Sequence, residues 1–300
     1  MRPPTHRLLL LLAAALLLPT ALGPQAQAVE VDPLEGLPEG SYRLDENHIA
    51  VPLRADTPDE YPPEVIAAAI AAGERGLAYN ASTREETALG AGYLFIQPGS
   101  WMVSPSLCTI GFVYGTPGAY SISSAGHCTR TGQPVVLALA PSLLVSVGRT
   151  VAHRNGGIGA DWSLTPVDAA FQPMVRPETA FVSGPQGGMY TAEIRADNPI
   201  PIKFTGHGHA IGTPGTPRAG LAFHTSGGAF YFTAPSMEGD SGAPVLTVGD
   251  ERHPQGQALG LLTHLVIDLN RVPTHMAGTR LSVLPGTPAM APSPGYTMPV

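Results

Sequence analysis

The chain has 300 residues, a formal net charge of −7 and charged side chains at only 13% of its positions. The acidic balance argues against nucleic acid as a partner, because binding to phosphates needs a basic surface. The 35 glycines and 32 prolines suit many short strands joined by turns. Once a targeting segment and a leader are set aside, roughly 190 to 210 residues are left, enough for one unit with a sizeable core.

The first 28 residues have the pattern of a secretory signal peptide. Arg2 and Arg7 precede an uninterrupted apolar run at positions 8–18. A small-x-small cleavage signature follows at 26–28. The run is too short to span a bilayer, which takes about 20 apolar residues. We therefore expect cleavage before Val29 and a secreted, extracellular protein with no membrane association afterwards.

Residues 29–89 differ in character from the rest of the chain, because Asp and Glu are dense there. Pro62-Pro63-Glu64 opens an apolar stretch that ends at Gly73, and proline at the start with glycine at the end predicts one short helix. We interpret this region as a leader or propeptide-like segment that either inhibits the following domain or assists its folding. A plain surface extension is the alternative, and nothing in the sequence fixes a maturation site.

From Gly90 onward, apolar and β-branched runs alternate with turn residues, which is typical of β-structure. The first half is expected to have strands at 92–96, 108–114, 119–124, 134–139, 143–147 and 162–167. The second half is expected to have strands at 180–182, 189–194, 202–204, 221–225, 229–233, 244–248 and 258–267. These runs define a domain over residues 90–284. Residues 285–300 are Pro-rich without apolar periodicity, which predicts a disordered tail.

Three separated segments carry the residue types of a nucleophilic catalytic site. Gly239-Asp240-Ser241-Gly242 supplies a serine, Gly126-His127-Cys128 a histidine and Ala160-Asp161-Trp162 a carboxylate. A serine hydroxyl becomes a good nucleophile at neutral pH when an imidazole takes its proton and a carboxylate fixes the tautomer of that imidazole. We therefore predict Ser241 as the nucleophile, His127 as the base and Asp161 as the orienting acid.

The neighbours of these residues fit the same chemistry. The backbone N–H groups of Gly239 and Ser241 can converge on the negative oxygen of a tetrahedral intermediate if the turn is tight, and Gly239 permits such a turn because it has no Cβ. Cys128 follows the histidine, and Cys108 is the only other cysteine. A bridge between them would clamp the base to a neighbouring strand and stabilise the fold by roughly 3 kcal/mol.

These segments, together with residues 106–112, resemble the chymotrypsin-like (trypsin-fold) serine proteases, and most closely the bacterial secreted branch of alpha-lytic protease and the streptogrisins. The chain order His, Asp, Ser separates them from subtilisins and α/β-hydrolases. The resemblance implies an all-β fold of two antiparallel six-stranded β-barrels with the active site between them. No Ile-Val-Gly-Gly sequence follows a basic residue, so activation by inserting a new N-terminus toward Asp240 is not indicated.

The resemblance implies a secreted serine endopeptidase that hydrolyses peptide bonds through an acyl-enzyme intermediate. It further implies polypeptide substrates and a monomeric protein without a cofactor. Two alternatives stay open: a catalytically inactive secreted homologue that acts as a binding protein, and a secreted esterase that uses the same triad. Inactive homologues usually lose one of the three catalytic side chains, and their presence here favours the enzyme.

Five positions are predicted to shape the substrate pocket. Pro235 stands where trypsin-like relatives carry an aspartate, which argues against a preference for Arg or Lys, whereas Glu238 on the rim argues the other way. Leu262 would line an apolar wall, and Thr263 stands where the family usually has a serine that contacts the catalytic carboxylate. His264 would either select acidic residues, as in glutamyl-specific relatives, or simply pack there, and we favour packing. The expected preference is a medium apolar residue before the cut.

His207 and His209 are spaced like two ligands of a metal site, because alternate residues on a strand share one face. A zinc site needs three or four ligands, and no further spaced cluster of His or Cys is evident in the sequence. We therefore predict no metal site.

Overall fold

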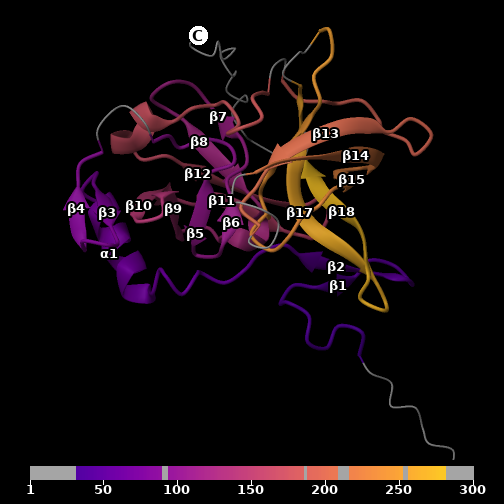
Figure 1. Ribbon diagram of the computed structural model, residues 1–300, viewed down its shortest axis with the longest axis horizontal. Coiled ribbons are helices and arrows are strands. Elements are labelled where there is room, and N and C mark those ends of the chain that lie inside the picture. The colour runs from indigo at the N-terminus through magenta and orange to yellow at the C-terminus, as the bar shows by residue number, and fades with distance from the viewer. Residues whose placement is uncertain (1–31, 90–93, 186–187, 209–215, 253–255, 282–300) are drawn as a thin grey trace, which may run out of the picture.

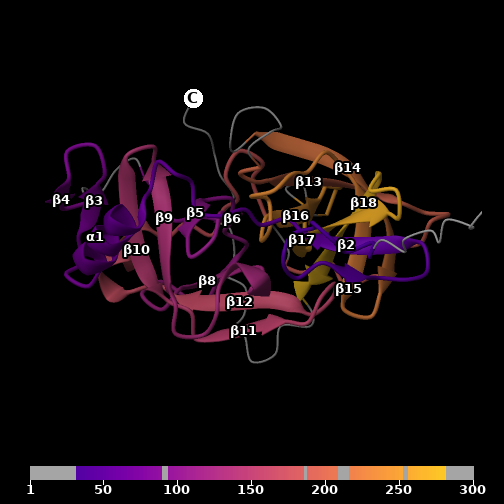
Figure 2. The ribbon, with the colours of Figure 1, turned by 90° about the horizontal axis from the view of Figure 1, so that it is seen from below.

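The computed structural model describes residues 32–89, 94–185, 188–208, 216–252 and 256–281. The expected signal peptide at 1–28 and the expected tail at 285–300 lie outside these residues. The described part of the chain forms two β-rich halves that lie side by side (Figures 1 and 2). Within it, no helix is long and apolar enough to cross a membrane.

The second half is a closed antiparallel barrel. Its strands follow one another in the order β17, β16, β13, β14, β15, β18, and pairing of β17 with β18 closes the ring. Phe204, Phe230, Phe232 and other buried apolar residues fill the interior. The six strands are β13 (Ile200–Thr205), β14 (Pro217–Ser226), β15 (Ala229–Thr233), β16 (Pro244–Thr247), β17 (Ala258–Asp268) and β18 (Pro273–Arg280).

The first half consists of two antiparallel sheets around a shared core. One sheet has the order β4, β3, β10, β9, β5, β6 and the other the order β11, β12, β8, β7. Met102, Val135 and Val145 from the first sheet pack in one cluster with Val113 and Ile122 from the second. The elements are β3 (Ala78–Asn80), β4 (Glu85–Thr87), β5 (Trp101–Ser104), β6 (Cys108–Thr109), β7 (Val113–Tyr114), β8 (Ser121–Ser124), β9 (Pro134–Ala140), β10 (Leu143–Arg149), β11 (Ala152–Asn155), β12 (Asp161–Pro166) and the 3-10 helices η1 (Gly126–Cys128) and η2 (Ala169–Met174). The all-β fold class is therefore confirmed, with a closed six-stranded barrel in the second half and two further antiparallel sheets in the first.

The N-terminal stretch contributes to both halves. Its first part forms β1 (Tyr42–Arg43) and β2 (His48–Pro52), and β2 pairs with β17 of the second half. Its second part forms the expected helix, α1 (Pro63–Gly73), which packs with β3, β9 and β10 on the first half. Figure 1 shows this indigo stretch passing below the two halves. The boundary of a leader at residue 89 stays a prediction.

Most of the expected strands from 108 onward are found, with two exceptions. Residues 180–182 form a turn, because Phe181 has a left-handed φ of 62° and its side chain points outward. Residues 189–194 make only a single bridge, between Met189 and Ala258. Of the expected strand at 92–96, the described part makes one bridge, from Ile96 to Val175. Strands β1 to β5, β11 and β18 were not expected.

Candidate active site

The three predicted catalytic side chains meet between the two halves. His127 lies in η1 and Asp161 begins β12 in the first half, while Ser241 lies between β15 and β16 of the second. The Oγ atom of Ser241 is 2.6 Å from Nε2 of His127, and Nδ1 of His127 is 2.5 Å from Oδ2 of Asp161. All three residues are buried. A ring that donates its Nδ1–H to the carboxylate leaves Nε2 free to accept the serine proton.

Asp161 is held in the ionised form by its neighbours. Burial alone would raise the pKa of Asp161, but the charge and hydrogen bonds of His127, with a smaller contribution from His264, lower the pKa below its usual value. The backbone N–H of His127 also donates to Oδ1 of Asp161 at 2.9 Å. The backbone N–H of Asp161 itself donates to Oγ1 of Thr279 on β18, which links the two halves. The carboxylate is therefore fixed on both sides.

The predicted disulfide is present. Cys108 on β6 and Cys128 at the end of η1 are joined, with their Cα atoms 6.3 Å apart. The two cysteines are 20 residues apart in sequence, and the bond ties the residue after His127 to the six-stranded sheet. The clamp expected beside the base is confirmed.

Two backbone N–H groups converge on one carbonyl oxygen beside Ser241. The N–H groups of Gly239 and Ser241 both donate to the carbonyl oxygen of Leu53, at 2.7 and 3.2 Å. Gly239 has a φ of 97°, and a Cβ there would stand 2.8 Å from the carbonyl oxygen of His207. Thr109 on β6 fixes the turn from the other side, because its hydroxyl donates to the carbonyl of Gly239. This arrangement has the spacing of an oxyanion hole.

The turn before Ser241 rests on a buried ion pair that the sequence did not reveal. Arg218 on β14 binds both carboxylate oxygens of Asp240 through its two terminal nitrogens, each at 2.5 Å. The carboxylate also accepts the backbone N–H groups of Gly208 and Met237. Asp240 is thus fully engaged by the folded chain itself, which agrees with an activation mode that needs no inserted N-terminus. No local motif marks Arg218, since it lies 22 residues away from its partner in sequence.

Two of the five predicted pocket residues lie against Leu53. Leu262 belongs to the same buried apolar cluster as the Leu53 side chain. The carbonyl oxygen of Thr263 accepts the backbone N–H of Leu53 at 3.1 Å and lies at the same distance from Oγ of Ser241. The Thr263 hydroxyl contacts Nδ1 of His264 and the carbonyl of Ala277.

Pro235 and Glu238 are exposed and lie at the edge of the site. The carbonyl of Pro235 accepts a hydrogen bond from Arg218, so this residue supports the buried ion pair. Glu238 lines a surface pocket with Arg54 and Ala55, the two residues that follow Leu53. Any attraction of Glu238 for a basic side chain would therefore act on the side of the site after Leu53.

His264 lies beside the triad. Its Nδ1 atom is 3.8 Å from Oδ2 of Asp161, and its ring makes edge contacts with the rings of His127 and Tyr42. Burial lowers the pKa of His264 to about 4, against the opposing attraction of Asp161. A neutral imidazole offers no positive charge to an acidic substrate, so these contacts favour the packing interpretation.

The groups that resemble metal sites are already engaged in other bonds. The ligand-type atoms of His127, Asp161 and His264 lie within 4.8 Å of one another, but both ring nitrogens of His127 face hydrogen-bond partners. A second group consists of His127 with the two cysteines, whose sulfur atoms form the disulfide. His207 stacks on Trp101 and its Nε2 lies 2.8 Å from the carbonyl of Gly99. His209 lies outside the described residues.

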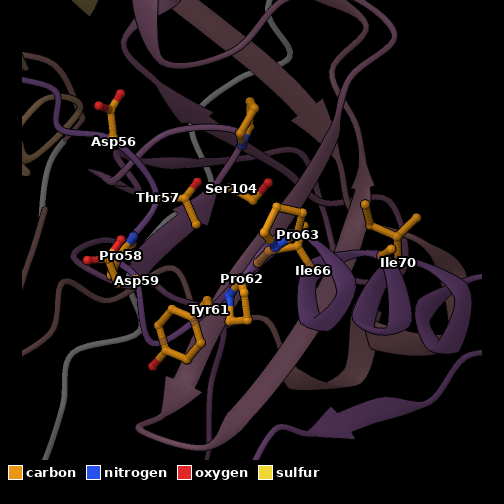
Figure 3. A pocket seen from close by; sticks show the side chains of 12 residues that line it. Asp56, Thr57, Pro58, Asp59, Tyr61, Pro62, Pro63, Ile66, Ile70 and Ser104 are labelled. Atoms are coloured by element: carbon orange, nitrogen blue, oxygen red, sulfur yellow. The ribbon is translucent and has the colours of Figure 1, made fainter.

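A pocket of about 570 Å³ lies next to the start of α1 and does not include the triad. Tyr61, Pro62, Pro63 and Ile66 form one side of it and Asp56 to Asp59 another, as Figure 3 shows. It belongs to the chain segment that runs from Leu53 toward the helix. At Ser241 itself, the carbonyl oxygen of Leu53 accepts the N–H groups of Gly239 and Ser241.

No protein-family model and no curated protein sequence matches the chain. Among solved structures, it is similar to protease A of Thermobifida fusca, with 18% identity and a TM-score of 0.45 over 65% of this chain and 98% of that one. A Nocardiopsis protease has 17% identity and a TM-score of 0.41, covering 62% and 92%. A glutamic acid-specific serine protease, described as using a histidine triad in substrate binding, has 15% identity and a TM-score of 0.43, covering 62% and 94%. The matches include bacterial serine proteases of the group that the sequence motifs resemble.

Proposed function

We propose that the chain is a serine endopeptidase that hydrolyses peptide bonds through an acyl-enzyme on Ser241. One observation carries this proposal: the hydroxyl of Ser241, hydrogen bonded to the pair of His127 and Asp161, lies in the same turn as two N–H groups that converge on a main-chain carbonyl. A nucleophile, its base and an oxyanion hole around one carbonyl are the parts that acyl transfer requires.

The geometry supports the following sequence of steps. Ser241 Oγ attacks the carbonyl carbon and gives its proton to Nε2 of His127, while the N–H groups of Gly239 and Ser241 stabilise the negative oxygen. The carbon–nitrogen bond then breaks, and His127 returns the proton to the leaving amine. Water, activated by the same imidazole, hydrolyses the acyl-enzyme. Asp161, with its lowered pKa, stays ionised and stabilises the imidazolium in both steps.

The way in which backbone is held favours a peptide over an ester as substrate. Next to the oxyanion hole, the carbonyl of Thr263 accepts an N–H group, and β17 offers a strand edge that β2 occupies. Such a site recognises extended polypeptide by adding it as a strand. A simple ester lacks the N–H group that Thr263 binds. The disulfide next to His127 supports folding in an oxidising compartment, and we propose secretion on that ground together with the N-terminal sequence.

Labelling with a fluorophosphonate tests the proposal. Ser241 should carry the label in the secreted protein, and Ser241→Ala should abolish it and reduce kcat by several orders of magnitude while leaving the fold intact. Ser226→Ala, an exposed serine at the end of β14, is the matched control and should label as the wild type does. Absence of label in protein freed of its N-terminal segment would indicate an inactive homologue. Hydrolysis of esters but not of peptides would indicate an esterase.

A further inference from the structure

The N-terminal segment lies in the groove where the proposed enzyme would hold a substrate. Strand β2 runs antiparallel to β17, with Val51 opposite Leu265 and Pro52 opposite His264. The next residue, Leu53, continues this pairing by donating its N–H to the carbonyl of Thr263. Figures 1 and 2 show β2 beside β17 on the second half, with the chain running on from β2 toward the first half.

Leu53 occupies both the oxyanion hole and an apolar pocket. Its carbonyl oxygen accepts the N–H groups of Gly239 and Ser241, and its side chain is only 2% exposed. The side chain belongs to the core cluster of the second half, together with Phe204 and Leu262. A peptide carbonyl held by both donors beside the nucleophile is in the position of a carbonyl about to be attacked.

The residues after Leu53 contact the first half instead. Ala55 exchanges two backbone hydrogen bonds with Leu107, at 3.2 and 2.9 Å. The guanidinium of Arg54 donates to the carbonyl of His127 and pairs with Glu39. The chain therefore crosses from the second half to the first at the bond between Leu53 and Arg54, with the triad beside it.

We propose that residues 49–55 are an intramolecular substrate and that Ser241 cleaves the Leu53–Arg54 peptide bond of its own chain. The inference rests on the proposed function, because it uses the same acyl transfer. Ser241 Oγ bonds to the Leu53 carbonyl carbon, the carbon–nitrogen bond to Arg54 breaks, and the proton passes through His127 to the new amino group of Arg54. Water then releases Leu53 as a carboxylate and restores the serine.

The proposal explains how the N-terminal stretch is divided. The part before the cut, with β2, is held on β17 and blocks the groove until cleavage. The part after the cut contains α1 and β3, which pack and pair with β10 as members of the first half. The functional boundary then lies after Leu53 and not at residue 89. A leucine in the pocket also identifies the substrate class: peptides with a medium apolar residue before the cut.

Intact mass and N-terminal sequencing of the purified full chain test the cleavage. The wild type should yield a chain that begins at Arg54, whereas Ser241→Ala should keep its Leu53–Arg54 bond. Because the bond is cleaved within one molecule, its half-life should not change over a 100-fold dilution. Cleavage of Ser241→Ala at the same bond by itself, or a rate proportional to concentration, would overturn the intramolecular proposal.

Substitutions of Leu53 test the pocket. Leu53→Asp should slow the cut by about 100-fold or more, because a carboxylate would have to enter an apolar pocket, while Leu53→Met should be cut at nearly the wild-type rate. Leu269→Asp, the same change at an exposed site, is the control. Circular dichroism and urea unfolding report whether each variant is folded, because an uncut chain blocks Ser241 and need not label. If Leu53→Asp is unfolded, Leu53→Ala decides in its place, with an expected slowing of about tenfold or more.

The outcomes separate the inference from the proposed function. A chain that labels at Ser241 and hydrolyses added peptides, but keeps the Leu53–Arg54 bond or begins elsewhere, overturns the inference and leaves the function standing. A chain that keeps the Leu53–Arg54 bond, and that neither labels nor hydrolyses peptides once it is freed of its N-terminal segment, overturns both. Cleavage of Leu53→Asp at the wild-type rate would show that the pocket contact does not select this bond.

Discussion

The two halves hold the residues of the proposed triad by different means. In the first half, the segment of His127 is tied to the six-stranded sheet by a disulfide, and Asp161 is hydrogen bonded to the His127 ring. In the second half, a closed barrel and the buried pair of Arg218 and Asp240 hold the turn that carries Ser241.

This contrast follows from how each half is built. The first half is made of two separate sheets, so a covalent bond limits movement of the short helix η1 between them. The second half is a closed ring, and its loop needs only a local anchor. A charged pair serves as that anchor because a buried carboxylate with hydrogen bonds on both oxygens has a single favourable orientation. Removing the disulfide should destabilise the first half and the segment of His127 more than the second half. Removing the ion pair should destabilise the second half and the turn of Ser241 more than the first.

The largest loss of stability is expected from Arg218→Met. The substitution leaves the carboxylate of Asp240 buried and without its cation, which typically costs about 3–5 kcal/mol. The turn with Gly239 should also lose its alignment, so fluorophosphonate labelling should slow strongly. Urea unfolding gives the free energy, and Arg252→Met, at an exposed position, is the control. Adding Asp240→Asn to Arg218→Met should recover part of the lost stability, since the buried, unpaired carboxylate is then removed. An unchanged unfolding free energy in Arg218→Met would show that the anchor is unimportant.

The three segments of the proposed triad could be recognised in the sequence because their chemistry is local. Each of His127, Asp161 and Ser241 sits in a short motif, and the two cysteines leave one possible intramolecular pairing. Helix α1 was also predictable, because proline at its start and glycine at its end mark its limits. These features need only a few neighbouring residues to be recognised.

The features that the sequence did not reveal depend on distant contacts. Arg218 has no motif and gains its role only when β14 brings it to Asp240. Leu53 looks like any residue of an apolar strand until folding brings it to Ser241. Strand β18 lacks apolar alternation, and its Gly278 is needed because a Cβ there would collide with the ring of Phe230. In each case tertiary packing, and not local preference, decides the outcome.

Removing the disulfide should have the next largest effect. The double variant Cys108→Ala/Cys128→Ala should lose about 3 kcal/mol of unfolding free energy, because the bond restricts the unfolded chain over its loop. Reducing the wild-type protein should produce the same loss when both proteins are compared by urea unfolding. The buried pair of Arg218 and Asp240 should be unaffected, so the residual structure of the second half should be retained. A loss well below 1 kcal/mol would mean that the two sheets hold His127 without the bond.

The two buried carboxylates also differ in how they respond to pH. Asp240 faces the permanent cation of Arg218, whereas Asp161 faces two imidazoles, His127 and His264, and lies near Tyr42. The carboxylate of Asp240 is bound by Arg218 and by two backbone N–H groups, and none of these partners is a histidine side chain. The site of Asp161 contains a buried imidazole whose pKa falls from 6.5 to about 4 on folding. Acid should therefore act on the side of the site that holds the base.

The smallest expected effect is the contribution of His264 to stability as the pH falls. Its folded pKa of about 4 lies below the unfolded value of 6.5, so between these values the unfolded chain binds more protons and stability rises with pH. The contribution is fully present above pH 6.5 and is lost as the pH falls toward 4, at a rate of at most about 1.4 kcal/mol per pH unit. The lowered pKa of Asp161 also makes stability fall as the pH falls, but only below pH 3.8, outside this window.

His264→Phe should flatten the dependence of unfolding free energy on pH between 4 and 6.5, while His224→Phe, at an exposed position, should leave it unchanged. Equal slopes in the wild type and in His264→Phe would show that His264 carries a proton in the folded protein, which would restore a positive charge beside the triad and reopen the preference for acidic substrates.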